Sequence, residues 1–499
     1  MFKYLASIFR SFVFHGTVTR EILCCAFLPL FKGGLKNRAK FDSYRAIAGA
    51  SQILKIFEYV TLILWGDKMT TDSMQFGFKK ETSTTQCSWL VLEVAQWFYQ
   101  RGGMVHAAFL DLKMAFDKCL FSTLFTKLLE KGIPAIIVRV LCFAYQEQKA
   151  WVRLGGRNSS TFDISNGTRQ GSVLSPYFFG VYLDKLLLRL RELKLGCYIA
   201  GMWMGACAFA DDIALLAPGR QVLQRMIKEC EIYGLETNLV FSTDPMPSKS
   251  KTKCMVFHGK RKIRYPDPVY LDGKALPWVD RVQHLGHTLH ESISMDFDTI
   301  RAKTSFMSRA NDLRDKLYFC HPSLKMKAIE LYCCDAYGSM LWDLSSRNVE
   351  SYFKAWNVQA RLAWNVPRET FTYLVEGYFC QDMITLRNQV LSRYPGFIRK
   401  LMTSPSKEIR FLVNTVMKDQ RSITARNINY LENIANCAVI RFANWKIRQN
   451  MPVKNVPPNE TWRIGLLTYL LEVRNSKNQS HTKASHIQIE EMISSLCST

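Results

Sequence analysis

The sequence predicts an α+β fold, because segments typical of buried strands alternate with segments typical of helices. Residues 107–110 form an apolar run of strand character that ends at Asp111. Residues 197–217 are among the most apolar of the chain and are typical of two strands that turn at or near Gly201. Residues 219–235 follow with apolar side chains at helical spacing. We therefore expect a sheet with carboxylates at one end of its strands.

Two adjacent carboxylates, Asp211 and Asp212, interrupt the apolar run 205–217, and no basic residue is nearer in sequence than Arg220. Burying an unpaired carboxylate costs on the order of several kcal/mol, so this pair needs water or a cation. Together with Asp111, the pair supplies carboxylates from two chain segments, as two-metal phosphoryl transfer requires. A solvated turn is the alternative for an Asp-Asp pair, and the apolar context argues against it.

The charge balance favours a polyanionic partner. The 499 residues include 66 Lys and Arg against 42 Asp and Glu, which gives a formal net charge of +24 and a pI near 9.4. No uninterrupted apolar span reaches the roughly 20 residues of a membrane helix, and Arg10 divides the apolar N-terminus, unlike a signal peptide. The 15 cysteines include no Cys-x-x-Cys pair, which favours a reduced, intracellular protein. Nucleic acid is therefore a better candidate partner than a membrane.

The C-terminal part of the chain is predicted to be helical. Residues 299–319 place apolar residues at near-helical spacing with Arg and Lys between them, and Trp356 and Trp364 lie eight positions apart on one predicted face. Basic residues interleaved with aromatic ones suit contact with a nucleic-acid backbone. A helical core with a solvated basic face is the alternative.

Farther upstream, Gly234 is the expected end of the helix that follows Asp212.

Three segments in order resemble the palm motifs of reverse transcriptases, specifically those of non-LTR retrotransposons of the LINE type, including jockey-like elements. They are AAFLDLKMAFD at 107–117, NGTRQGSVLSP at 166–176 and AFADDIALLA at 208–217. Further segments resemble other parts of these enzymes: 28–58 the fingers, 75–84 the segment before the first aspartate, 234–257 the lysine-bearing motif and 282–289 the primer grip. The resemblance is specific over about residues 20–300 and looser beyond.

The resemblance implies a right-hand polymerase with fingers, a palm built on an antiparallel sheet, a helical thumb and a helical C-terminal region. We expect an N-terminal extension and fingers over 1–105, and a palm with interleaved fingers over 106–260. A primer-grip hairpin and helical thumb should occupy 261–385, and the helical C-terminal region 386–499.

The same resemblance assigns the catalytic residues. It implies that Asp111, Asp211 and Asp212 hold two Mg²⁺ ions, with Mn²⁺ as a possible substitute. Phe116 falls where the family places a bulky side chain against the 2′ position of the sugar, so its ring is expected to select dNTPs.

Other residues are implied to bind the incoming nucleotide. Gln170 and Gly171 match the turn that lines the nucleotide, and glycine suits a close approach to the main chain. Arg45 and Lys32 match the cations of the fingers that clamp the triphosphate, although for Lys32 an ordinary surface charge is an equal alternative. Lys251 is the expected lysine near the pyrophosphate, with Lys253 as the alternative.

Two departures from the family pattern are visible. Phe209 stands where many relatives carry Tyr, which keeps the ring and does not threaten metal binding. No segment resembling an endonuclease precedes the fingers, and no Cys/His cluster follows the thumb. Either the chain is a fragment of a longer open reading frame, or an endonuclease is supplied in trans.

The expected function is therefore RNA-directed DNA polymerisation, with an RNA template, a DNA primer and dNTPs as partners. We expect the protein in the nucleus and cytoplasm as a ribonucleoprotein, and the sequence does not indicate an oligomeric state. One alternative is a catalytically inactive nucleic-acid-binding relic of such an element. Another is an RNA-dependent RNA polymerase, which Phe116 and the motif around Gln170 disfavour.

Overall fold

The computed structural model describes residues 2–33, 37–244, 250–372 and 383–434, together with Met246 and Val375. The chain divides into two compact units, the first formed by residues 1–87 and 102–280 and the second by 88–101 and 281–499. The predicted division into four domains stays a prediction. No helix within the described ranges is long and apolar enough to span a bilayer.

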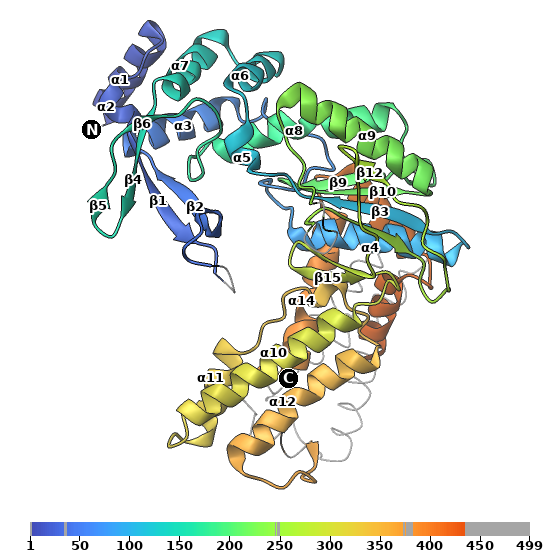
Figure 1. Cartoon of the computed structure of the whole chain (residues 1–499). Helices are drawn as coiled ribbons and strands as arrows, with labels where there is room; N and C mark the ends of the chain where they lie inside the picture. Colours follow the sequence, from blue (N-terminus) through green and yellow to red (C-terminus); the bar gives the residue numbers. More distant parts are fainter. Residues whose placement is uncertain are drawn as a thin grey trace, which may run out of the picture. The chain divides into compact units, whose positions relative to one another are not determined.

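The first unit contains a four-stranded antiparallel sheet (Figure 1). The three aspartates lie at the ends of its strands. In the order β11-β3-β10-β9, its strands are β11 Lys253–Phe257, β3 Val105–Leu110, β10 Asp212–Ala217 and β9 Ala206–Phe209. Helices α8 (Ser175–Glu192) and α9 (Arg220–Thr237) pack against this sheet. Because its strands are almost entirely buried, their sequences are largely apolar instead of alternating, with His106, Asp212 and Lys253 as exceptions. The predicted α+β fold is confirmed.

The same unit contains a second sheet, which includes part of the segment predicted to form the fingers. Its strands are β1 Cys25–Phe31, β2 Tyr44–Gly49, β4 Lys149–Leu154, β5 Arg157–Asn158 and β6 Phe162–Asp163. The surrounding helices are α1 Phe2–His15, α2 Arg20–Leu23, α3 Gln52–Trp65, α5 Ala115–Lys118, α6 Phe121–Glu130 and α7 Ala135–Gln146. Leu30 of β1 pairs with Arg45 of β2. Since side chains alternate along a strand, Arg45 lies on the opposite face from Tyr44 and Ala46.

Two local predictions need correction. The turn at Gly201 is present, but it joins the short strands β7 (Tyr198–Ile199) and β8 (Met202–Trp203), whereas the aspartates lie on the next hairpin, β9–β10. The predicted end of α9 at Gly234 is wrong, since the helix continues to Thr237 and Asn238 caps it in the left-handed conformation. Gly234 is needed for packing instead, because a Cβ there would lie 2.7 Å from the carbonyl oxygen of Leu239.

The second unit is mainly helical, and the helix predicted over 299–319 is observed as α10. Its elements are α4 Thr84–Gln100, whose first residues belong to the first unit, β14 Arg281–His284, β15 His287–His290, α10 Asp296–Lys316, α11 Pro322–Tyr332, α12 Arg347–Trp364, α14 Leu386–Met402 and α15 Lys407–Val416. Trp356 is buried on α12 next to Tyr352, whose ring meets that of Trp342 at 5.2 Å. The part of the predicted C-terminal region beyond residue 434 lies outside the described residues.

Glu93 is a buried acid in this unit, and it makes stability depend on pH. Its Oε1 accepts hydrogen bonds from the hydroxyl of Thr424 at 2.6 Å and from the Thr424 N–H at 3.2 Å. Burial, only partly opposed by these bonds, raises the pKa of Glu93 from 4.5 to about 7. The folded state therefore holds its proton more tightly than the unfolded chain, and stability is lost as pH rises from about 4.5 to 7.

We expect Glu93→Gln to be more stable than the parent protein at pH 8, by up to about 3 kcal/mol, because the amide carries no charge to bury. At pH 4.5 the two proteins should unfold alike. Denaturant unfolding at both pH values measures this difference, with Glu369→Gln at an exposed position as the control. A stability difference that does not change with pH would contradict the assignment.

Candidate active site at the end of the four-stranded sheet

Asp211 and Asp212 lie on a tight turn between β9 and β10. Phe209 pairs with Asp212, so that Ala210 and Asp211 form a two-residue turn. Ala210 has a φ of 58°, which is unfavourable for a residue with a side chain. The Gln75 side chain stabilises this conformation, because its Oε1 accepts from the Ala210 N–H at 3.0 Å and its Nε2 donates to the Ala210 carbonyl at 3.4 Å. Gln75 thus fixes the backbone of the turn that carries the two carboxylates.

Residues 74–77 approach this turn as an additional edge. Phe76 donates its N–H to the Ala208 carbonyl at 2.7 Å, and Ala208 donates to the Met74 carbonyl at 2.9 Å. Gly77 must be glycine here, because a Cβ would lie 2.4 Å from the Ala210 nitrogen. This contact gives a physical reason for the segment at 75–84 that resembles the family.

Asp111 reaches the same sheet end from β3. Leu110 pairs with Ile213, so Asp111 follows β3 beside the residue that starts β10. The Asp111 N–H bonds to the Thr252 hydroxyl at 3.2 Å, and its Oδ2 accepts from the Nζ of Lys251 at 3.3 Å. The structure thus brings the three predicted aspartates together and places Lys251 beside them.

Lys253 takes a different position. It lies within β11 opposite Phe109, where the ladder fixes its backbone, and no described contact links its side chain to the aspartates. Of the two candidate lysines, the structure therefore places Lys251 at the carboxylates.

The electrostatics of this cluster show mutual repulsion. Burial, followed by the charges of Asp211 and Asp111, raises the pKa of Asp212 to about 6, and Lys251 acts in the opposite direction. The pKa of Asp211 is also raised, mainly by burial and then by Asp111, while Lys251 and Arg45 lower it. Like-charged carboxylates held together in this way are stabilised by a bound cation.

The carboxylate oxygens of this cluster are candidate ligands for a divalent metal ion. Among the described residues, no three acidic, histidine or cysteine side chains already form a metal cage. Magnesium seldom uses such a cage in phosphoryl-transfer sites, since one or two carboxylates, waters and substrate phosphates complete its octahedron. Hard carboxylate oxygens under mutual repulsion suit Mg²⁺ and Mn²⁺, so Asp111, Asp211 and Asp212 fit the group.

The predicted nucleotide-binding residues differ in which carboxylate they act on. Arg45 acts electrostatically on Asp211. Lys32 acts on Asp117 instead, and it lowers an Asp117 pKa that partial burial raises. Gln170 also bonds to Asp117, and its backbone carbonyl accepts from the Ala48 N–H at 2.7 Å.

Gly171, the next residue, lies close to the backbone of Ala48. It has a φ of 107°, and a Cβ there would lie 3.1 Å from the Ala48 carbonyl oxygen. The loop that carries Gln170 and Gly171 is thus held against the end of β2, which also carries Arg45.

Phe116 follows Asp111 by five positions. Its side chain is partly exposed and packs on two other aromatic rings. It stacks on Phe179 at 4.7 Å between centroids, and Phe78 meets it edge-on at 6.2 Å. These contacts support the ring of Phe116, whose side chain remains partly exposed.

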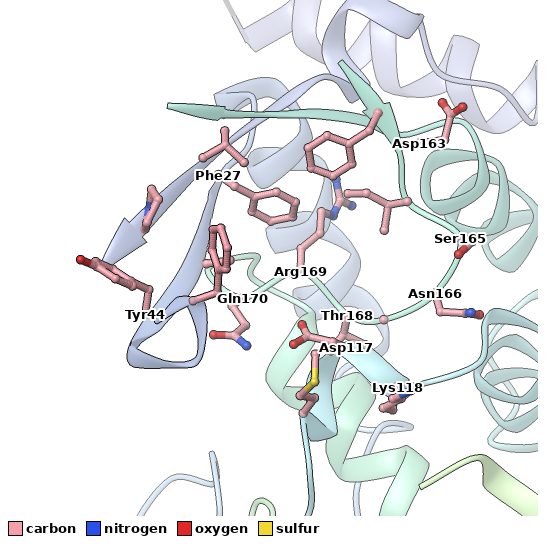
Figure 2. Close-up of a pocket in the computed structure, with 18 of the residues that line it drawn as sticks. Phe27, Tyr44, Asp117, Lys118, Asp163, Ser165, Asn166, Thr168, Arg169 and Gln170 are labelled. Carbon is pink, nitrogen blue, oxygen red and sulfur yellow. The ribbon is translucent and has the colours of Figure 1, made fainter. Parts of the chain in front are cut away.

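A cavity of about 820 Å³ lies beside the Gln170 loop, on the face of the fingers sheet that carries Phe27 and Tyr44 (Figure 2). Asp117, Arg169 and Gln170 line it as well. Arg45 does not, because it lies on the other face of β2. Arg45 and the cavity therefore lie on different sides of these strands.

Sequence reasoning missed a buried ion pair that supports this loop. Arg169 bonds to Glu58 of α3 at 3.1 Å, and both side chains are at most 2% exposed. The second carboxylate oxygen of Glu58 accepts from the Ser172 hydroxyl and from the Val173 N–H, the latter at 2.9 Å. Glu58 is the sole acid in the largely apolar helix α3, and this was the available signal.

Comparisons with known proteins agree with this geometry. Residues 35–289, about half of the chain, match the family described as reverse transcriptase (RNA-dependent DNA polymerase). A Pol polyprotein of the type-1 retrotransposable element R2 from Nasonia vitripennis is 27% identical over 259 residues, which are 52% of this chain and 24% of that protein. The RNA-directed DNA polymerase of the mobile element jockey from Drosophila funebris is 24% identical over 319 residues, or 61% of this chain and 33% of that protein.

Among solved structures, a telomerase from Candida albicans matches with a TM-score of 0.40 and 12% identity, over 85% of this chain and 66% of that chain. The chain spans about a quarter to a third of the length of the curated relatives described above. The match to the family model covers all three palm motifs, in a chain with the mixed helix and sheet content of a right-hand polymerase. This chain belongs to the reverse transcriptase family, and its reverse transcriptase domain is similar to those of non-LTR retrotransposons.

Proposed function

We propose that the chain is an RNA-directed DNA polymerase that extends a DNA 3′-hydroxyl on an RNA template. The observation that carries this proposal is the convergence of Asp111, Asp211 and Asp212 at one sheet end beside Lys251. The template, the primer and dNTPs are the proposed partners, in a ribonucleoprotein of the nucleus and cytoplasm. Any DNA cleavage would come from elsewhere in a longer protein or from an endonuclease acting in trans.

The three carboxylates would hold two Mg²⁺ ions, which supply activation of the attacking hydroxyl and charge stabilisation of the leaving pyrophosphate. Lys251, which pairs with Asp111 in this structure, would bind the pyrophosphate instead, because its flexible ammonium group can pair with either anion. Arg45 would bind the triphosphate with its guanidinium fork. Gly171 would let the nucleotide approach the backbone, with Gln170 beside it.

A primer-extension assay tests this function directly. Purified protein, an RNA template annealed to a DNA primer, dNTPs and Mg²⁺ should yield extended DNA, and chelation of the metal should stop the reaction. The alternative, an inactive relic, predicts binding of the hybrid duplex without extension. Extension with rNTPs in preference to dNTPs would favour an RNA polymerase.

We expect Phe116→Val to raise the use of rNTPs relative to dNTPs, because the smaller side chain no longer blocks a 2′-hydroxyl. A lost steric contact of this size is worth about 1–3 kcal/mol, or roughly tenfold to a hundredfold in the ratio of kcat/KM values. Phe116→Tyr keeps the ring and serves as the matched control. An unchanged ratio in Phe116→Val would assign the ring to packing against Phe179 alone.

We also expect the helices of the second unit to bind the nucleic-acid backbone. Replacing the exposed Lys316, Lys327 and Lys354 by Gln should flatten the dependence of affinity on salt, by about 0.9 in logarithmic slope for each lost phosphate contact. The Kd for a hybrid duplex across a salt series measures this. Equal slopes for the triple variant and the parent protein would remove these helices from the binding surface.

A further inference from the structure

An apolar groove lies on the fingers side of the first unit, away from the residues assigned above. It has a volume of about 1010 Å³ and is walled by three helices, α1, α3 and α7. Leu5, Phe9 and Val13 come from α1, Val60 and Leu64 from α3, and Ile136 from α7. We call this feature the α1/α3/α7 groove.

Aromatic contacts join two of the helices that wall the groove, although some of the lining side chains are exposed to solvent. The ring of Phe9 meets that of Phe57 at 5.4 Å, and Phe12 meets Phe57 at 5.9 Å, so α1 is anchored on α3. Phe14 is nevertheless 79% exposed and Leu64 57%. Large apolar side chains left exposed in one continuous hollow are typical of a binding surface.

Arg10 lines the groove, and the charged side chains that are not buried on the three walling helices are all positive. Helices α1, α3 and α7 contain four Lys and Arg residues, none of them buried: Lys3, Arg10, Lys55 and Arg139. Their only acid is Glu58, which is buried against Arg169. An occupant must therefore combine an apolar face with negative charge.

We propose that the α1/α3/α7 groove binds an acidic amphipathic helix of a partner protein. Helix α1 has 14 residues, so the groove offers a wall about 20 Å long, enough for roughly four turns of a docked helix. An apolar helix face laid into such a groove, with its charges on the rim, is a recurring mode of recognition. Glutamates on the flanks of the partner helix would meet Arg10 and its basic neighbours.

Other occupants fit less well. A second copy of this chain would bring the same four positive charges against themselves, which is unfavourable. Nucleic-acid phosphates would pair with the basic side chains beside the groove, but they would leave its apolar lining exposed to water. A flat anionic bilayer would meet the rim without filling a concave groove.

A synthetic helical peptide tests the proposal on the full chain. The probe is a fluorescent peptide of about 18 residues, five turns, with Leu at i, i+3, i+4 and i+7 and Glu at the exposed positions. Fluorescence anisotropy measures its Kd. A peptide with Lys in place of every Glu, and one of scrambled order, are the controls for charge and for pattern.

Two substitutions on α3 form a matched pair. Leu64 lines the groove, whereas Ile63 is 68% exposed on the same helix and does not line it. We expect Leu64→Glu to weaken peptide binding at least about tenfold and Ile63→Glu by no more than about twofold, because only the first places a charge against the apolar face. Arg10→Glu should also weaken binding of the Glu peptide and not that of the Lys peptide.

Four results would overturn the proposal. They are equal losses in Leu64→Glu and Ile63→Glu, equal binding of the Glu and Lys peptides, preferred binding to phosphatidylserine vesicles over the Glu peptide, and self-association that Leu64→Glu abolishes. Crosslinks from the groove to residues 435–499 of the same chain would likewise assign the groove to this chain itself.

Discussion

Asp211→Asn is expected to abolish extension of a DNA primer on an RNA template, with a loss of at least about a thousandfold in kcat. The amide has nearly the volume of the carboxylate, but it lacks the charge that a divalent ion needs. Metal stabilisation of the transition state is worth several kcal/mol, and each 1.36 kcal/mol is about a factor of ten. The turn should persist, because Gln75 holds the neighbouring Ala210 through its backbone.

Binding separates this loss from misfolding. The variant should bind the hybrid duplex with nearly the affinity of the parent protein, because Asp211 offers no positive charge to the phosphates. Asp315→Asn is the matched control, because the Asp315 side chain is 76% exposed. This variant should extend primers normally. Normal extension by Asp211→Asn would remove this residue from the metal site.

The convergence of the three aspartates could be predicted because its sequence signal is local. Asp111, Asp211 and Asp212 interrupt strands that are otherwise buried, and a buried charge has few explanations. The family motifs then added the order and roles of the segments. The choice between Lys251 and Lys253 needed the structure, because it depends on where β11 begins and on the register of Lys253 against Phe109.

Long-range support could not be predicted in the same way. Gln75 and Gly77 matter because residues 74–77 lie against the β9–β10 turn, more than a hundred positions away in sequence. The end of α9 was missed because Gly234 resembles a helix terminator, whereas its small size serves the approach of Leu239. In each case the missing information is which distant backbone comes close.

The ion pair between Glu58 and Arg169 is the strongest example of such support, and Glu58→Gln is expected to destabilise the protein severely. Removing one partner of a buried pair leaves an uncompensated charge, which costs about 3–5 kcal/mol. Here Arg169 would remain about 2% exposed, over the ring of Tyr145 at 4.6 Å. Chemical denaturation of the parent protein and the variant measures the loss.

A double substitution shows whether the charge or the packing is responsible. Glu58→Met with Arg169→Met removes both charges, so it should be more stable than Glu58→Gln alone. Recovery should be incomplete, because the Ser172 hydroxyl and the Val173 N–H lose their acceptor, at about 1–3 kcal/mol for each buried group. If the double variant is less stable than Glu58→Gln, the bonds to Ser172 and Val173 outweigh the ion pair. Since Gln170 and Gly171 lie between Arg169 and Ser172, the double variant should also raise the KM for dNTPs more than it lowers kcat.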